Sequence, residues 1–241
     1  MRILAVIPAR YAATRFPGKP LAELGGRPVI QWVYEAAVRC PAFDEVVVAT
    51  DDPRILETVR GFGGLAELTR ADHRSGTDRV AELAGRRPDA EVIVNVQGDQ
   101  PFASAESLAA LVEPYVRGGA PPMTTLACPL TEPAARSDPN TVKVVCDVRG
   151  NALYFSRACI PHSEVGSGAV LHHLGLYAFT RDALLRFAAL DPTPLAVQED
   201  LEQLRALEHG MRIRVCQTGQ PALEINTPED LDAARRLLAA D

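Results

Sequence analysis

The sequence predicts an α/β fold: a doubly wound, mostly parallel mixed sheet with an antiparallel extension. In the first half, short apolar runs suited to buried strands alternate with segments whose apolar residues have helical spacing. From residue 123 onwards, strand-like runs follow one another with short connections, which is typical of antiparallel pairing. We therefore expect a single domain over residues 1–241, with a small antiparallel portion at about 123–179.

The first half has the order of parallel βαβ units. Pro8 is expected to stop the first strand, because proline has no N–H for the ladder. Pro28, Pro53, Thr77 and Ser104 are expected near helix starts. Strands are expected at 3–7, 46–49, 65–68 and 91–96, and helices at about 28–40, 53–61, 77–83 and 104–116.

The second half departs from this alternation. Arg149-Gly-Asn151 predicts the turn of a hairpin, and Lys143 is expected to face solvent from the strand before it. Thr227-Pro-Glu-Asp230 is a strong helix start, with a Thr cap, a proline at the first position and acids in the first turn. Strands are expected at 123–128, 142–147, 152–155, 174–179 and 212–217, and helices at 182–189, 194–209 and from 227 to the C-terminus.

Composition excludes several classes of function. The net charge of −6 and the pI near 5.4 argue against broad nucleic-acid binding, which needs a basic face. No apolar run approaches the roughly 20 residues of a membrane span. The five cysteines are scattered without a C-x-x-C, so we expect reduced, buried thiols in a cytoplasmic protein and no zinc site. The glycine signatures of dinucleotide-binding and P-loop proteins are absent, which removes the main support for a nicotinamide-dependent oxidoreductase.

The loop after the first strand indicates an anion site. It contains Arg10, Arg15 and Lys19 and no acid, so its charges repel one another unless an anion binds. Open α/β sheets bind nucleotides beyond the carboxyl ends of their strands, and Asp99 follows another strand at that edge. Only two of the 25 basic residues are lysines, so Lys19 indicates a need for a compact ammonium group. The alternative is a solvated loop with incidental charge.

Taken together, the motifs resemble the CTP:3-deoxy-manno-octulosonate cytidylyltransferase family, the CMP-KDO synthetases of lipopolysaccharide assembly. The resemblance covers nearly the whole chain in the same order. It is carried by Pro8-Ala-Arg-Tyr11, Thr14-Arg-Phe-Pro-Gly-Lys-Pro20, Val48-Ala-Thr-Asp51, Thr69-Arg-Ala-Asp-His73, Ser75-Gly-Thr-Asp-Arg79, Asn95-Val-Gln-Gly-Asp99, Ala152-Leu-Tyr-Phe-Ser-Arg157, His173-Leu-Gly175, Leu201-Glu-Gln-Leu-Arg205 and Thr227-Pro-Glu-Asp230.

This resemblance implies a nucleotide-diphospho-sugar transferase fold, a homodimer formed through the 123–179 portion, and Mg²⁺ as cofactor. It implies transfer of CMP from CTP to a 2-keto sugar acid with release of pyrophosphate, and no nucleic-acid or membrane partner. The implied catalytic residues are Arg10, Lys19 and Asp99. The implied binding residues are Ala9, Arg10, Arg15, Lys19, Arg74, Ser75 and Gln97 for the nucleotide, Gln100, Arg157, His173, Tyr177, Glu199 and Gln203 for the acceptor, and Asp99 and Asn226 for the metal.

Three departures from the family's pattern leave alternatives open. Asn226 stands where the family usually has Asp, Ala13 where a Ser is expected, and the short segment 158–172 has no Arg or Lys. These changes affect the acceptor side and one metal ligand, so a smaller acid such as phosphonoformate is an alternative acceptor. From another class, the chain could be a non-catalytic CTP-binding protein. Among the implied site residues, His173 could instead be a core histidine, and Arg157 with Glu199 a structural ion pair.

Overall fold

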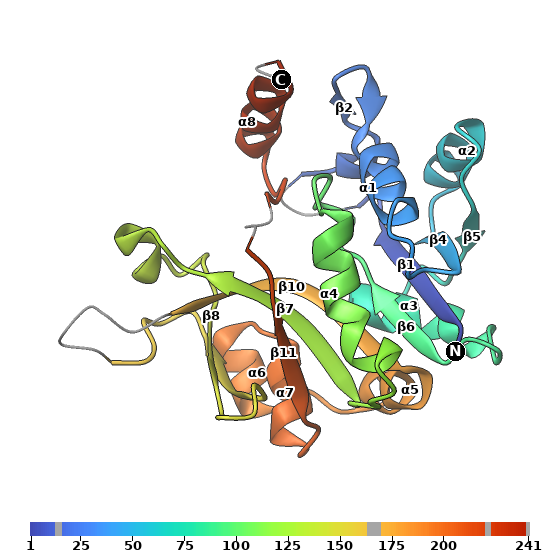
Figure 1. Ribbon diagram of the computed structural model, residues 1–241. Helices are drawn as coiled ribbons and strands as arrows, with labels where there is room; N and C mark the ends of the chain where they lie inside the picture. Colours follow the sequence, from blue (N-terminus) through green and yellow to red (C-terminus); the bar gives the residue numbers. More distant parts are fainter. Residues whose placement is uncertain (13–15, 163–169, 220–222, 240–241) are drawn as a thin grey trace. The chain divides into compact units, whose positions relative to one another are not determined.

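The computed structural model describes residues 1–12, 16–162, 170–219 and 223–239. The chain divides into two units, Met1–Ala109 with Ala222–Asp241, and Ala110–Pro221. The boundary between them falls within one helix, α4 (Ala105–Val116). Each unit is built around its own strands (Figure 1).

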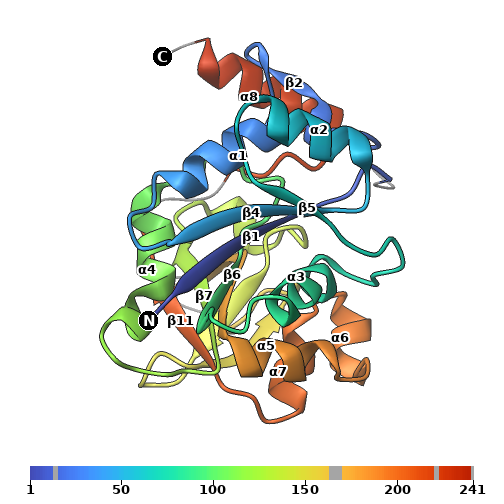
Figure 2. The ribbon, with the colours of Figure 1, turned by 90° about the vertical axis from the view of Figure 1, so that its right-hand side faces the viewer.

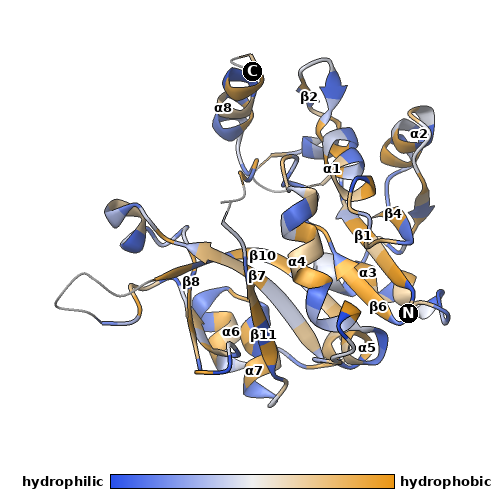
Figure 3. Ribbon diagram, in the orientation of Figure 1, coloured by the Kyte–Doolittle hydropathy of each residue, from blue (hydrophilic) through white to orange (hydrophobic). Residues whose placement is uncertain are grey.

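The first unit contains four parallel strands in the order β6-β1-β4-β5. The central strand is buried from Ile3 to Ile7, and Figure 3 shows it as a continuous apolar element. Helices α1 and α2 lie on one face of these strands and α3 on the other (Figure 2). The elements are β1 (Ile3–Ala9), η1 (Lys19–Leu21), β2 (Glu23–Leu24), β3 (Arg27–Pro28), α1 (Val29–Val38), β4 (Glu45–Thr50), α2 (Pro53–Gly61), β5 (Ala66–Leu68), α3 (Gly76–Gly85), β6 (Val92–Asn95) and α8 (Pro228–Leu238).

One local prediction for this unit was wrong. Pro8 does not stop β1, which continues to Ala9 with Pro8 opposite Ala49 of β4. On its other side β1 is paired with β6 only as far as Val6, so the missing N–H of Pro8 removes no ladder bond there. Helix α3 begins at Gly76, because the hydroxyl of Ser75 caps it by accepting from the backbone N–H of Asp78 at 3.1 Å.

The second unit confirms the antiparallel extension. Strand β10 is antiparallel to β7 and β8, the β8–β9 pair is a hairpin, and β11 pairs with β7 in parallel. The elements are β7 (Met123–Pro129), η2 (Pro133–Arg136), β8 (Lys143–Cys146), β9 (Ala152–Ser156), β10 (Leu171–Thr180), α5 (Arg181–Ala188), α6 (Pro194–Glu199), α7 (Gln203–Glu208) and β11 (Ile213–Gln217).

Three expectations for the second unit need correction. The helix expected over 194–209 is split into α6 and α7, because Asp200 has a φ of 52° in the left-handed region, which ends a helix. Only Cys40 and Cys128 are buried, whereas Cys146 and Cys216 are half-buried and Cys159 is exposed, although all five cysteines are free thiols as expected. Lys143 is fully buried and does not face solvent. Within the described ranges, no helix is long and apolar enough to cross a membrane.

Lys143 ties separate segments of the second unit together through its ammonium group. Its Nζ donates to the backbone oxygens of Asp138 at 3.0 Å, Thr141 at 2.6 Å and Arg157 at 2.6 Å. An ammonium group has three N–H donors, so all of them are used within the unit. Burial of the ammonium group is therefore compensated by hydrogen bonds from all three of its N–H donors to backbone carbonyls.

We expect Lys143→Met to destabilise the protein. Three hydrogen bonds from the ammonium group are lost, and the loss should be about 2–4 kcal/mol, which corresponds to a lower melting temperature by roughly 5–15 °C. Calorimetry or circular dichroism measures this. Arg236→Met, which removes an exposed cation of α8, is the control and should shift the melting temperature by less than about 2 °C. Equal shifts in the two variants would contradict a structural role for Lys143.

Candidate functional site

A cavity of about 270 Å³ opens in the first unit at the carboxyl edge of its parallel strands. This is the edge at which the sequence predicted the anion site. Five parts of the chain reach it: the end of β1, the η1 turn, the start of α3, the segment after β6 and the segment before α8. The lining residues are Pro8, Ala9, Arg10, Phe16, Lys19, Pro20, His73, Ser75, Gly76, Arg79, Gln97, Gly98, Asp99 and Asn226.

Close packing between the ends of β1 and β6 sets the shape of this edge. The N–H of Val96 donates to the carbonyl of Val6 at 2.9 Å, which continues the pairing beyond β6. A Cβ atom on Gly98 would lie 2.9 Å from the carbonyl oxygen of Pro8, closer than a side chain tolerates. Glycine at this position therefore allows the segment carrying Asp99 to pass directly against the start of the cationic loop.

Lys19 and Asp99 form an ion pair at the centre of the cavity. The Lys19 Nζ atom lies 3.0 Å from Asp99 Oδ2, and the side chains are 15% and 23% exposed. Ala9 is buried, so it offers the ligand only its backbone, whereas Arg10 is exposed at the cavity wall. The predicted residues Ala9, Arg10, Lys19 and Asp99 are thus brought together. Arg15 and Ala13 lie outside the described residues.

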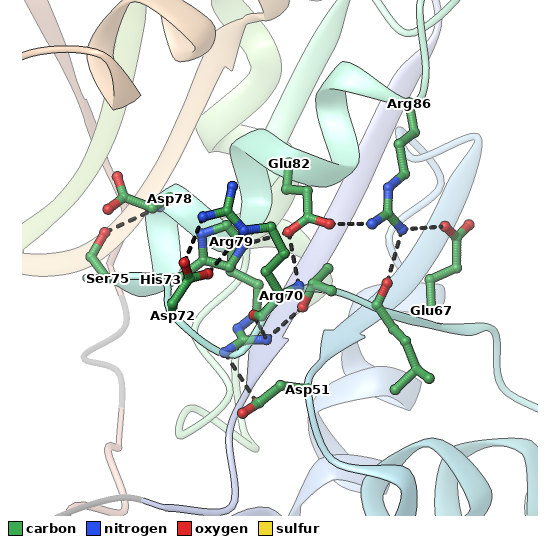
Figure 4. Close-up of polar contacts among 12 residues, drawn as sticks. Asp51, Glu67, Arg70, Asp72, His73, Ser75, Asp78, Arg79, Glu82 and Arg86 are labelled. Atoms are coloured by element: carbon green, nitrogen blue, oxygen red, sulfur yellow. Dashed lines mark hydrogen bonds and ion pairs between the residues drawn. The ribbon is translucent and has the colours of Figure 1, made fainter.

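A second group of charges, which had no assigned role in the sequence analysis, forms the wall on the α3 side (Figure 4). The buried Arg79 pairs with Asp51 at 3.1 Å and donates to the hydroxyl of Thr69 at 2.5 Å. Burial lowers the pKa of Arg79, and the carboxylate of Asp51 opposes that effect. The network therefore fixes a guanidinium group beside the cavity.

His73 lies in the same wall and is held by Glu82. Its Nε2 atom is 2.5 Å from a Glu82 carboxylate oxygen, which also accepts from the backbone N–H of Arg70 at 3.0 Å (Figure 4). Although burial opposes them, these hydrogen bonds keep the pKa of Glu82 below its usual value. His73 and Arg79 both line the cavity. Their membership in the quoted motifs Thr69–His73 and Ser75–Arg79 was the signal in the sequence that could have identified them.

Of the three residues predicted to hold the base, two line the cavity. Arg74 is exposed, and its Nε donates to Asp78 at 3.1 Å, while Gln97 follows β6 and lines the cavity. The Ser75 oxygen is used as the cap of α3, which leaves its hydroxyl hydrogen to be donated to a ligand. Ser75 and Gln97 thus line one cavity, whereas Arg74 is not part of its lining.

Asp99 and Asn226 line the cavity together and suit a hard cation. The set comprises one carboxylate and one carboxamide, which are oxygen donors of the kind that Mg²⁺ uses alongside phosphate oxygens and water. In the part of the chain that is described, no cluster of three His, Cys, Asp or Glu residues could hold a metal without a ligand's help. Asn226 is not the cap of α8, because Thr227 has that role in a complete capping box.

Glu224 is a further acidic residue next to this pair, and the sequence analysis missed it. Its carboxylate accepts from Gln100 Nε2 at 3.1 Å and from Asn226 Nδ2 at 3.0 Å. Partial withdrawal of the carboxyl group from water and the nearby charge of Asp99 raise the pKa of Glu224, even though the residue as a whole is exposed. In the sequence, Glu224 could have been noticed as an acid two residues before the predicted metal ligand Asn226.

The residues predicted for the acceptor are distributed over both units. Gln100 belongs to the first unit, where it is buried against Glu224. In the second unit the hydroxyl of Tyr177 donates to Gln203 at 3.0 Å, so these two are brought together. His173 is buried, lies 2.9 Å from the Thr125 hydroxyl and packs its ring against Phe155.

The charge state of His173 limits what it can do. Burial, with a smaller contribution from His172, lowers the pKa of His173 to about 3. The imidazole is therefore neutral at physiological pH and cannot offer a positive charge to an acid. Any contribution of His173 to acceptor binding would be through a neutral hydrogen bond or through the packing of β10.

Arg157 and Glu199 are linked, but not as a simple ion pair between side chains. The Glu199 carboxylate accepts from the backbone N–H of Arg157 at 2.9 Å and from the Ser156 hydroxyl at 2.6 Å. The Arg157 guanidinium donates to three backbone oxygens, those of Glu199 at 2.8 Å, Pro139 at 3.0 Å and Asp200 at 3.2 Å. The guanidinium group of Arg157 thus donates to backbone oxygens of its own unit. Its contact with an acceptor carboxylate stays a prediction.

Comparison with known proteins agrees with the resemblance seen in the motifs. The family model of the cytidylyltransferases matches residues 4–213. The 3-deoxy-manno-octulosonate cytidylyltransferase of Acaryochloris marina is 57% identical over 236 residues, which cover 98% of this chain and 96% of the relative. The protein of the same name from Syntrophotalea carbinolica is 52% identical over 241 residues, which cover 96% of each chain.

Solved structures give the same result for the fold. A structure of CMP:2-keto-3-deoxy-manno-octonic acid synthetase complexed with CTP matches with a TM-score of 0.95 and 39% identity, covering 100% of this chain and 99% of the other. A cytidylyltransferase from Leptospira borgpetersenii shares the fold, with a TM-score of 0.67 at 16% identity over 100% of this chain and 88% of the other. On the match to the family model and on relatives more than half identical over nearly its full length, the chain belongs to the cytidylyltransferase family.

Proposed function

We propose that this protein transfers CMP from CTP to 3-deoxy-manno-octulosonate (KDO), releasing pyrophosphate. The observation that carries the proposal is the cavity at the carboxyl edge of β1 and β6, where Arg10, Lys19 and Arg79 gather in a chain of net charge −6. A local concentration of cations in an acidic protein suits a small polyanion. The names of the relatives and of the CTP-bound structural neighbour support the choice of CTP and KDO.

In this reaction the anomeric hydroxyl of KDO attacks the α-phosphorus, and the bond to the bridging oxygen of pyrophosphate breaks. Negative charge moves onto the leaving group, and fixed cations next to it lower the barrier. Lys19 is held in place by Asp99, and Arg79 by Asp51, so neither cation has to reorganise during the reaction. Arg10 is exposed and completes the cationic wall.

Magnesium is the cofactor that we propose for this site. Asp99 and Asn226 would hold it together with the phosphate oxygens of CTP. When bound, Mg²⁺ supplies positive charge to the phosphates and can lower the pKa of a bound hydroxyl. Lys19 already pairs with one oxygen of Asp99, which holds that carboxylate in place.

The acceptor and the assembly are finer points of the proposal. The relatives' names favour KDO over a smaller acid such as phosphonoformate, which the short segment 158–172 suggested. A homodimer, formed through the antiparallel portion at about 123–179, and a cytoplasmic location complete the proposal. Sedimentation or light scattering of the purified protein tests the dimer, with a mass of twice 26.0 kDa expected.

The direct test of the function is pyrophosphate release in the presence of Mg²⁺. We expect release with CTP and KDO together, and little with either alone or with ATP in place of CTP, because the pocket of Ser75 and Gln97 suits a pyrimidine edge. Release with CTP and phosphonoformate but not KDO would select the alternative acceptor. CTP binding without release under every acceptor would identify a non-catalytic CTP-binding protein.

Lys19→Ala is expected to lower kcat by about 10²–10³-fold with the fold intact, because the fixed ammonium group at the phosphates is lost. Lys19→Arg should recover little of this activity, since a planar guanidinium cannot replace a compact charge 3.0 Å from Asp99. Steady-state kinetics and a melting curve for each variant measure these effects. Near-native kcat for Lys19→Arg would show that any cation suffices at this position.

Arg157→Ala is expected to raise the KM for the acceptor by about 10-fold or more and the KM for CTP much less, since a charged contact to the acid is lost. Because Arg157 also binds three backbone oxygens, the melting temperature should fall as well. Tyr154→Phe is a matched control, since it removes a contact to Glu199 without a charge. If both KM values change equally in Arg157→Ala, the residue acts only through the structure of its unit.

A further inference from the structure

Gln100, Glu224 and Asn226 form a chain of side-chain hydrogen bonds behind the proposed metal site. Gln100 Nε2 donates to one oxygen of Glu224 at 3.1 Å, and Asn226 Nδ2 donates to the other at 3.0 Å. The backbone holds the same segments together, because the N–H of Ile225 donates to the carbonyl of Asp99 at 2.8 Å. The positions of Glu224 and Asp99 are therefore fixed relative to each other.

The chemistry of these groups determines which way the Asn226 amide faces. A carboxylate only accepts hydrogen bonds, so Asn226 must turn its NH₂ group toward Glu224. Its carboxamide oxygen is then directed away from Glu224. Asn226 and Asp99 line the cavity, whereas Glu224 is not part of the lining. The oxygen of Asn226 is thus the atom available to a cation on the cavity side.

We propose that Glu224 is a positioning residue that orients Asn226 so that its side-chain oxygen, and not its nitrogen, faces the metal beside Asp99. This inference rests on the proposed function only in that it needs a metal–nucleotide complex at this site. Groups that hold a metal ligand in one orientation commonly change metal affinity by about 10–100-fold when removed. For an amide the orientation is decisive, because its nitrogen cannot bind a cation.

The same arrangement explains why an amide and not an acid stands at position 226. An aspartate there would place its carboxylate against Glu224, within reach of the negative charge of Asp99. With Asn226, the negative charge is on Glu224, which bonds Asn226 and does not line the cavity. The NH₂ group of Asn226 donates a hydrogen bond to the Glu224 carboxylate, and this bond increases the negative partial charge on the amide oxygen of Asn226. Glu224 and Asn226 therefore act as one unit.

Glu224→Gln separates orientation from folding. The substituted side chain has one acceptor oxygen and one NH₂ group, so it can accept from Gln100 or from Asn226 but not from both. Gln100 is only 1% exposed and is the less able to turn. We therefore expect Asn226 to turn, which places its NH₂ group toward the metal. The double variant with Asn226→Asp removes this conflict, since the new amide at position 224 can then donate to the new carboxylate at position 226.

The test measures Mn²⁺ binding to the protein–CTP complex by electron paramagnetic resonance, without an acceptor. We expect Glu224→Gln to weaken Mn²⁺ binding about 10-fold or more, and the double variant to restore native or tighter binding. Asn226→Asp alone should lower the melting temperature of the metal-free protein, and adding Glu224→Gln should raise it again. Glu57→Gln, the same change on the exposed face of α2, is the control and should alter neither quantity.

Three outcomes would overturn the inference: unchanged Mn²⁺ affinity in Glu224→Gln, no rescue in the double variant, or no Mn²⁺ binding by the native complex. Failure of the proposed function is a separate result. It would appear as native protein that binds Mn²⁺ and CTP, with the expected variant pattern, but releases no pyrophosphate with KDO.

Discussion

The ion pair between Lys19 and Asp99 is the interaction on which the site depends. It connects the cationic loop after β1 with the segment after β6, two regions 80 residues apart in the chain. The two regions can meet only because β1 and β6 are adjacent parallel strands and Gly98 lets the backbone pass against Pro8. The ion pair holds each of the two side chains in place at the cavity.

The elements with strong periodic or capping signals could be predicted from the sequence. The parallel order of the first unit follows from β1, β4 and β6, and the capping box at Thr227 was recognisable from four residues. The errors come from local rules that tertiary context overrides. Pro8 is tolerated inside β1 because its neighbour on that side has already ended, and Asp200 adopts the left-handed region within an otherwise helical pattern.

Within the site, the sequence identified the residues that carry charge at strand ends, since their position follows from the parallel sheet alone. It did not identify groups whose role depends on side-chain partners. Lys143 looked like an exposed strand residue, but three backbone carbonyls from separate segments converge on it. Arg79 bonds a residue 10 positions away, His73 one 9 positions away and Glu224 one 124 positions away, and no motif encodes these distances along the chain.

Three side chains of the cavity wall are each held by an acidic partner that is not part of the lining. Asp51 lies behind Arg79, Glu82 behind His73, and Glu224 behind Asn226. Each partner is an acid. The side chains that line the cavity here are therefore cationic or neutral, and the carboxylates that orient them lie outside the lining. Repulsion of the triphosphate is thereby weaker than its attraction, because Coulomb energy falls with distance and is screened by the intervening group. Asp99 is the exception, and it is the acid that Lys19 neutralises directly. An acidic chain can thus present a cationic cavity without a surplus of basic residues.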